Sequence, residues 1–314
     1  MSIKPMLAAK YEEAKIHAHL AEGPLVMQPK IDGMRIVVSD ERLPLSRSGK
    51  EYKQKHIRRW LQDHPSLIHM DGEAVAGHVY NPEVFRESMS GIRAEDGAAE
   101  FSFYAFDRFG EVASGGYQER RASLEETIGR LGGIQEANGY HARLVLCPQA
   151  IVNTIDEINA EEERLIALGW EGAILRNPRR PYKHGRATMR EGTLIKLKRF
   201  EDAEAIVVGY EPWYVNGNDA VQSPLGFTVR SAHQENLTPI ERLGVLKVEL
   251  LTDRSVKFGI GVMRGVTHAD RDRMWVNRES LIGKICTFAH QGYGGGYDVP
   301  RTPVFLNWRN AIDL

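Results

Sequence analysis

Cysteine is scarce in this chain of 314 residues, which contains only Cys147 and Cys286. Two cysteines cannot build a disulfide framework or a four-thiolate zinc site. Long apolar runs are also missing, because no stretch reaches the roughly eighteen uninterrupted apolar residues that a membrane helix requires. The N-terminal residues lack the apolar core of a signal peptide. We therefore expect a cytoplasmic protein without membrane attachment.

An excess of charge of one sign is likewise absent, since 41 Lys and Arg oppose 42 Asp and Glu for a formal net charge of -1. A uniformly basic nucleic-acid binder is excluded. Two local stretches are nevertheless basic: residues 42–59 and 176–199 each contain a single acidic residue, Glu51 and Glu191 respectively. Such stretches are either solvated faces or binding surfaces, and charge alone leaves both interpretations open.

Hydrophobic periodicity predicts an α+β fold for the first two hundred residues. Helical spacing predicts two helices, at Gln118–Leu131 and Asp156–Leu168. Alternation predicts strands at Leu25–Val38, Met70–Ala76, Phe101–Phe109, Leu144–Val152, Glu171–Arg176 and Leu194–Phe200. Strands with isolated helices, and without regular βαβ alternation, favour a mainly antiparallel sheet in a first domain at residues 1–202.

The remaining residues, 203–314, show a different pattern, with short predicted strands and one predicted helix, His268–Val276. This pattern is typical of a small β-barrel such as an OB-fold. The segment at about residues 211–244 is too long for a simple hairpin loop and contains several Gly, Asn and Pro residues. A surface excursion of that length is usually functional or disordered.

The sharpest motif is Lys30-Ile31-Asp32-Gly33-Met34-Arg35, which follows an apolar strand. A lysine becomes a nucleophile when burial and neighbouring cations lower its pKa, because only the neutral amine attacks. The alternative is a β-hairpin in which Asp32 and Gly33 supply the turn and the charged side chains point to water.

The string resembles the nucleotidyl-lysine motif of the superfamily that contains ATP-dependent DNA ligases, RNA ligases and mRNA capping enzymes. Further segments resemble the other motifs of that superfamily, in the same order: Ser46-Arg47-Ser48-Gly49, Asp71-Gly72-Glu73, Tyr104-Ala105-Phe106-Asp107, Glu171-Gly172-Ala173-Ile174-Leu175-Arg176 and Ile195-Lys196-Leu197-Lys198. The resemblance covers essentially the whole chain and is closest to minimal DNA ligases of viruses, phages and bacteria. It implies a nucleotidyltransferase domain followed by an OB-fold domain, in a bacterial or phage-infected cell.

The resemblance also implies the residues that handle the nucleotide. Lys30 is the expected catalytic nucleophile toward ATP. Glu171 and Asp32 are expected to provide oxygen ligands for Mg²⁺ or Mn²⁺. The expected nucleotide-binding residues are Arg35 and Glu73 at the ribose, Phe106 at the adenine, Lys196 and Lys198 at the phosphates, and Arg301 with Asp313 at the pyrophosphate. Lys196 and Lys198 are two apart on a predicted strand and point to one face.

For the polynucleotide, the resemblance assigns Arg47 and Arg186 to the 5′-phosphate side of a nick. A guanidinium suits a terminal phosphate. Residues 211–244 resemble the latch insertion of small viral ligases, in which Arg230 and His233 are the expected phosphate contacts. Only 29 residues precede Lys30, which leaves no room in this sequence for a nicotinamide-recognition domain. ATP is therefore the expected donor.

The sequence thus predicts a monomeric ATP-dependent DNA ligase that seals nicked duplex DNA without an obligatory protein partner. The nearest alternative is an RNA ligase or capping-type nucleotidyltransferase that uses the same lysine chemistry. A second alternative is a non-catalytic OB protein that binds nucleic acid, but a pure binder has no need for Lys30, Glu171 and the paired lysines together.

Overall fold

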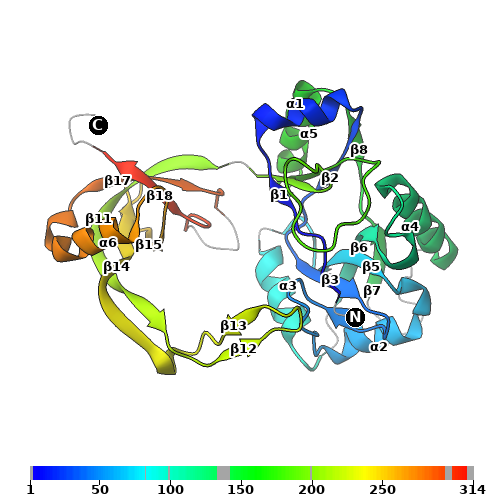
Figure 1. Ribbon diagram of the computed structural model, residues 1–314, viewed down its shortest axis with the longest axis horizontal. Coiled ribbons are helices and arrows are strands. Elements are labelled where there is room, and N and C mark those ends of the chain that lie inside the picture. The colour runs from blue at the N-terminus through cyan, green and yellow to red at the C-terminus, as the bar shows by residue number, and fades with distance from the viewer. Residues whose placement is uncertain are drawn as a thin grey trace. The chain divides into compact units, whose positions relative to one another are not determined.

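The computed structural model describes residues 3–81, 83–97, 100–132, 142–198, 200–293 and 299–309. The chain divides into two compact units, of which the first comprises Met1–Lys198 with Ser223–Phe227 and the second Arg199–Gln222 with Thr228–Leu314. Figure 1 shows helices and sheets in both units, so the predicted α+β class is confirmed. None of the helices in the described ranges is long and apolar enough to cross a membrane.

Two five-stranded sheets form the framework of the first unit. The strands of one, in spatial order, are β1 (Ala9–Lys10), β10 (Ile195–Leu197), β9 (Ala173–Arg176), β2 (Leu25–Pro29) and β8 (Ala150–Val152). Those of the other are β4 (Pro44–Leu45), β3 (Met34–Val38), β5 (Met70–Ala76), β6 (Phe101–Arg108) and β7 (Ala142–Leu146). Pairing is antiparallel except for β1 with β10 and β6 with β7.

Five α-helices of the first unit cover these sheets: α1 (Glu13–Ala21), α2 (Lys55–Asp63), α3 (Val84–Arg93), α4 (Tyr117–Leu131) and α5 (Ile155–Ala167). The described part of the unit also contains two short 3-10 helices, η1 (Pro65–Leu67) and η2 (Gly110–Val112). The two predicted helices are confirmed as α4 and α5. Sequence reasoning missed the other three. One of them, α2, begins in the first basic stretch, yet Ile57, Trp60 and Leu61 form a buried stripe at helical spacing.

Each sheet of the first unit has its own apolar core. Ile36, Phe101 and Phe103 of the β3-β5-β6 sheet pack with Trp60 of α2 and Leu124 of α4. The other sheet packs against α1 and α5 through a second buried cluster that includes Ile16, Leu25, Met27, Ile158 and Leu175. The chain passes from one sheet to the other between β2 and β3, so this short connection lies where the two sheets meet.

The second unit contains a six-stranded sheet in the order β15 (Lys257–Ile260), β14 (Leu237–Leu250), β11 (Glu201–Asn216), β17 (Ile285–His290), β18 (Val304–Trp308) and β16 (Val262–Met263). It also contains α6 (His268–Val276), which was predicted, and the 3-10 helices η3 (Gln234–Asn236) and η4 (Arg278–Leu281). The strand order of the described residues is open, from β15 to β16, so the closed small barrel stays a prediction.

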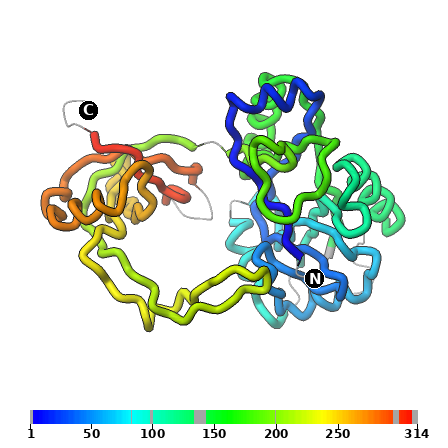
Figure 2. The backbone as a smooth tube through the Cα atoms, viewed as in Figure 1, coloured from blue at the N-terminus to red at the C-terminus, as the bar shows by residue number. Residues whose placement is uncertain are grey.

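The predicted excursion at residues 211–244 is largely a β-ribbon. The outer parts of β11 and β14 pair from Glu211 opposite Val245 to Asn216 opposite Leu237. Beyond them lies a two-stranded hairpin of β12 (Ala220–Gln222) and β13 (Thr228–Arg230). Figure 2 shows β11 and β14 side by side up to this hairpin. Paired strands therefore replace the loop that composition suggested.

Helix α6 begins with a capping box, in which Thr267 accepts from the backbone N–H of Asp270 and the Asp270 side chain accepts from the backbone N–H of Thr267. Replacing Thr267 with alanine should lower the free energy of unfolding by about 1 kcal/mol, because one helix N–H loses its acceptor. Urea unfolding of the full chain measures this change. Thr267→Ser keeps the acceptor and should stay close to the parent; an equal loss in both variants would contradict the capping role.

Candidate functional site

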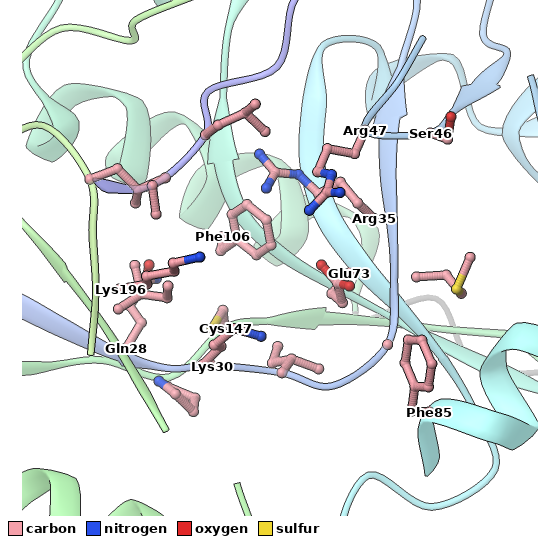
Figure 3. Close-up of a pocket in the computed structure, with 18 of the residues that line it drawn as sticks. Gln28, Lys30, Arg35, Ser46, Arg47, Glu73, Phe85, Phe106, Cys147 and Lys196 are labelled. Carbon is pink, nitrogen blue, oxygen red and sulfur yellow. The ribbon is translucent and has the colours of Figure 1, made fainter. Parts of the chain in front are cut away.

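The first unit contains a cavity of about 520 Å³ where its two sheets meet. Figure 3 shows Lys30, Arg35, Glu73, Phe106 and Lys196 around this cavity. The structure brings seven of the residues predicted from sequence to its wall: Lys30, Arg35, Arg47, Glu73, Phe106, Arg186 and Lys196. They come from β3, β5, β6, β10 and the segments between strands, so only the folded chain assembles them.

Lys30 lies in the connection between the sheets, directly after β2. Because β2 pairs with β8 and β9 whereas β3 pairs with β4 and β5, the hairpin interpretation of this motif is wrong. The backbone N–H of Lys30 donates to the carbonyl of Gly172 at 2.8 Å, and the N–H of Glu171 donates to the carbonyl of Lys30 at 3.2 Å. These two bonds hold Glu171 beside Lys30.

The Glu171 carboxylate forms ion pairs with Nζ of both Lys30 and Lys198. Its side chain is only 8% exposed. A buried carboxylate shared between two ammonium groups is well compensated, and it holds Lys198 next to Lys30. Lys198 follows β10 and does not line the cavity itself, but this ion pair connects it to Lys30.

Lys30 has the properties of a nucleophile. Burial, followed by the positive charge of Lys198, lowers its pKa to about 8, and Lys196 adds to this effect; the carboxylates of Glu73 and Asp32 act in the opposite direction. A pKa near 8 leaves a substantial fraction of neutral amine close to neutral pH, which an exposed lysine lacks. The side chain therefore combines nucleophilicity with access to the cavity.

Arg35 is fixed by a bidentate ion pair with the buried Asp71, with Nε and Nη2 each 2.5 Å from a carboxylate oxygen. The hydroxyl of Tyr182 donates to the same carboxylate at 2.6 Å. The pKa of Tyr182 lies well above its usual value because the ring is buried and next to Asp71, so its hydroxyl remains a donor. This arrangement orients the Arg35 guanidinium at the cavity wall.

Glu73 lies opposite Arg35 in the register of β3 and β5. Burial raises its pKa to about 7, although the positive charges of Arg35 and Lys30 oppose that shift. Near neutral pH the carboxyl therefore exists in both protonation states and can either donate or accept a hydrogen bond. Such a group is suited to the hydroxyl groups of a polar ligand.

Phe106 presents its ring to the cavity, whereas its neighbour Tyr104 packs toward Trp170 with ring centroids 6.3 Å apart. Two guanidinium groups lie over the Phe106 ring: Cζ of Arg35 is 4.7 Å and Cζ of Arg176 is 5.5 Å from its centroid. Cation–π contacts of this kind fix the ring plane. Phe106 is therefore a cavity aromatic with a constrained orientation and not only a core residue.

A buried charge network lies behind Phe106. Asp107 accepts from Nη1 of Arg176 at 2.5 Å and from Nε of Arg120 at 2.7 Å, and all three residues are at most 2% exposed. Arg176 Nε also donates to Gln28 Oε1 at 2.7 Å, while Gln28 Nε2 donates to the Tyr117 hydroxyl at 2.9 Å. Hydrogen bonds between buried side chains therefore link β2, β6 and β9 behind the cavity wall.

Sequence reasoning missed several members of this wall as site residues. Asp71 and Asp107 stand inside motifs that it identified, and Gln28 lies two residues before Lys30, so a signal was present. No local signal marks Arg120 or Tyr182, because helix α4 and the segment after β9 reach the site only through tertiary packing.

Three cationic side chains of the cavity wall have no carboxylate partner in the described ranges. No ion pair joins Arg47, Arg186 or Lys196 to any acidic residue in the described ranges, and Arg186 only donates to the carbonyl of Ala8 at 3.3 Å. Burial, and then the charges of Lys198 and Arg186, lower the pKa of Lys196. Uncompensated cations around a cavity are typical of sites that bind phosphate groups.

The site residues predicted in the second unit have, where the structure describes them, local contacts within that unit. Arg230, on β13, donates to the carbonyl of Asn218 within its own hairpin. His233 is exposed, and its backbone N–H donates to Ser231 Oγ at 3.2 Å. The backbone N–H of Arg301 donates to the carbonyl of Gly292 at 3.0 Å. Asp313 lies outside the described residues.

The carboxylates near Lys30 are the side chains of this site that could bind a metal ion. No cluster of three or more histidine, cysteine, aspartate or glutamate side chains that could hold a metal occurs in the described ranges. Glu171 and Asp32 are oxygen donors next to Lys30. This donor set suits Mg²⁺, which proteins often hold through one or two carboxylates together with phosphate oxygens and water.

Gly172 allows Glu171 to reach Lys30. Its φ is +145°, and a Cβ at this position would lie 2.6 Å from the carbonyl oxygen of Leu197. Gly172→Ala should therefore lower the free energy of unfolding by more than about 1 kcal/mol, measured by urea denaturation. Gly129→Ala is the matched control, because nothing lies within 4 Å of its Cβ and a helical alanine should be neutral or stabilising. Equal stability of the two variants would contradict the steric argument.

Comparison with known proteins is consistent with this arrangement. Residues 5–198 match the family model described as the ATP dependent DNA ligase domain. The DNA ligase of Enterobacteria phage T6 is 26% identical over 329 aligned positions, which cover 89% of this chain and 62% of the relative. The DNA ligase of African swine fever virus is 25% identical and covers 59% of this chain and 44% of the relative. The chain thus spans less than two thirds of the length of these curated relatives.

Solved structures show a similar fold. The Chlorella virus DNA ligase-adenylate is 27% identical, with a TM-score of 0.55, and the match covers 98% of this chain and 100% of that one. A Lig E DNA ligase is 20% identical with a TM-score of 0.68, and its match covers 98% of this chain and 100% of that one.

Proposed function

The chain belongs to the family of ATP-dependent DNA ligases, and from that premise we propose that it seals nicks with 5′-phosphate and 3′-OH ends in duplex DNA. The observation that supports the proposal most directly is the position of Lys30, a lysine of lowered pKa that lines the cavity of about 520 Å³ and pairs with Glu171. ATP is the co-substrate.

In the first step, Nζ of Lys30 attacks the α-phosphorus of ATP, a phosphorus–nitrogen bond forms and the bond to pyrophosphate breaks. Negative charge grows on the phosphoryl oxygens during this attack, and Lys196 and Lys198 stabilise it. The pKa of Lys30 lets the amine lose its proton before the attack. The product is an enzyme that carries AMP on Lys30.

The nucleoside is held by the opposite wall. Phe106 stacks on the adenine, and its ring plane is set by the guanidinium of Arg176. Arg35 and Glu73 hydrogen-bond the ribose hydroxyls, since Asp71 fixes the former and burial leaves the latter able to donate. These contacts hold the α-phosphate near Lys30 during the transfer.

Glu171 and Asp32 would hold Mg²⁺ or Mn²⁺. A bound divalent cation supplies further positive charge toward the phosphate oxygens. Glu171 in addition positions Lys30 and Lys198 through its two ion pairs.

In the second step an oxygen of the 5′-phosphate at the nick attacks the phosphorus of the lysine-bound AMP, and the phosphorus–nitrogen bond breaks, which frees Lys30 and leaves AMP on the DNA end. In the third step the 3′-OH attacks the phosphorus of the DNA 5′-phosphate, a phosphodiester bond forms and AMP leaves. Arg47 and Arg186 bind the 5′-phosphate, which the absence of carboxylate partners among the described residues supports. Arg301 and Asp313 orient the pyrophosphate in the first step.

We further propose that the enzyme works as a monomer without a protein partner, with a nucleotidyltransferase domain at residues 1–202 and an OB-fold domain at residues 203–314. The β-ribbon and hairpin at about residues 211–244 act as a latch on DNA, with Arg230 and His233 as phosphate contacts. A hinge at residues 200–203 lets the OB domain swing between the ATP-bound and DNA-bound states.

A sealing assay tests the proposal. The substrate is a 5′-phosphorylated nicked duplex with Mg²⁺, and the donors ATP, GTP and NAD are compared. Sealing with ATP alone is the expected result. Enzyme that becomes labelled with the donor nucleotide but seals only RNA, or that prefers GTP, would instead identify an RNA ligase or a capping-type nucleotidyltransferase. Absence of any labelled enzyme would overturn the proposal.

A further inference from the structure

Lys10 occupies the outer end of a row of residues that runs across one sheet. In the register of β1, β10, β9 and β2, Lys10 lies beside Lys196, Lys196 beside Ile174, and Ile174 beside Gln28. Side chains of directly paired residues on adjacent strands project from the same face. Since Gln28, Ile174 and Lys196 all line the cavity, the side chain of Lys10 projects from the cavity face as well.

Several cations act on Lys196 at this end of the row. After burial, the cations that lower the pKa of Lys196 are Lys198, Arg186, Lys10 and Arg47, so Lys10 and the other three all act on this one lysine. Like charges held together raise the free energy of the folded chain unless an anion binds among them. Lys10 therefore extends the group of cations on the cavity wall beyond the cavity itself.

Lys10 carries no ion pair to any residue in the described ranges, and it is exposed. Lys15 of α1, the next lysine along the chain, does form an ion pair: its Nζ lies 2.6 Å from the Glu12 carboxylate. The backbone around Lys10 is nevertheless fixed, since Ala9 N donates to Leu194 O at 2.9 Å and Tyr11 N donates to Lys196 O at 3.0 Å. A free ammonium on a fixed strand is suited to hold an external anion.

We propose that Lys10 is a further DNA-binding residue, which contacts a phosphate of the polynucleotide next to the nick. This inference rests on the proposed function. Lys10 does not line the nucleotide cavity, whereas Leu7 and Ala8 before it do. The phosphate within its reach therefore belongs to a strand that lies over the mouth of the cavity and not to ATP inside it.

The test uses the full chain with Lys10→Met, which keeps most of the apolar stem and removes the charge, and Lys10→Arg, which restores the charge. Lys15→Met is the matched control on the neighbouring helix. Binding to a 5′-phosphorylated nicked duplex is measured at several salt concentrations without ATP. Formation of labelled enzyme is measured separately with ATP and no DNA, which distinguishes the two sources of phosphate.

Lys10→Met should weaken DNA binding about 5- to 20-fold at low salt and reduce the slope of log K against log salt by about 1, as expected for one lost phosphate contact. Lys10→Arg should bind within about twofold of the parent, and the KM for ATP should stay unchanged in both variants. Lys15→Met should alter neither quantity.

A raised KM for ATP with unchanged DNA binding would overturn the assignment and place Lys10 at the triphosphate. An unchanged salt slope in Lys10→Met would overturn it as well. Both results are distinct from failure of the proposed function, in which the parent chain itself would neither bind nor seal the nicked duplex.

Discussion

Lys30→Ala is expected to abolish formation of labelled enzyme from ATP, with a loss of at least about 10³-fold that reaches background. The physical reason is that no other nucleophile takes the place of this amine, whose pKa of about 8 results mainly from burial. Lys30→Arg should be equally inactive, because a guanidinium does not lose its proton in a protein. The measurement is transfer of the labelled α-phosphate of ATP to the protein, followed by denaturing electrophoresis.

Lys15→Ala provides the control, since this lysine is exposed and its ion pair in the described ranges is with Glu12, the N-cap residue of α1. It should label at the parental rate. Circular dichroism of Lys30→Ala should match the parent and show that the chain is folded. Labelling of Lys30→Ala at a rate close to that of the parent would place the nucleophile elsewhere and refute the central proposal.

Asp107→Asn should cause the largest loss of stability that we predict, about 3–5 kcal/mol in the free energy of unfolding. Asp107 is fully buried between Arg120 and Arg176, and both guanidinium groups would lose their compensating charge. The amide of asparagine cannot accept from both cations at its two positions, because one of its oxygens is replaced by a donor. Urea unfolding, monitored by tryptophan fluorescence, measures the change.

The matched control is Glu126→Gln on α4, which removes a carboxylate from an ion pair with Arg130 that is exposed on both sides. This change should stay within about 0.5 kcal/mol of the parent, because exposed ion pairs contribute little. If Asp107→Asn lost no more than this control, the two buried arginines would have another source of compensation and the network would not hold the cavity wall.

Much of the first unit could be predicted because its elements carry strong local signals. The strand at Met70–Ala76 has the predicted bounds, and in the second unit so does the helix His268–Val276, because alternation and capping mark them clearly. The motif lysines, the carboxylates and Phe106 could be identified because each stands in a short string of restrictive residue types. Their convergence on one cavity is an outcome of the fold.

Where prediction failed, the deciding contacts are distant in sequence. The segments Leu25–Val38 and Leu144–Val152 each read as one apolar stretch, yet each supplies strands to two different sheets. Apolar alternation shows that a residue is buried but not against which partner. The predicted loop at residues 211–244 became a ribbon because β11 and β14 continue to pair beyond the body of the sheet.

The sequence by itself determined the chemical groups of this protein: a lysine nucleophile, two paired lysines, an aromatic residue and several carboxylates, each recognisable from its neighbours. The tertiary structure decided the pKa values and the partners of those groups. Burial between two sheets lowers the pKa of Lys30 and raises that of Glu73. Strand register alone places Lys10 beside Lys196. A side chain's chemistry is local, but its pKa and partners depend on the dielectric environment and charges that distant segments bring to it.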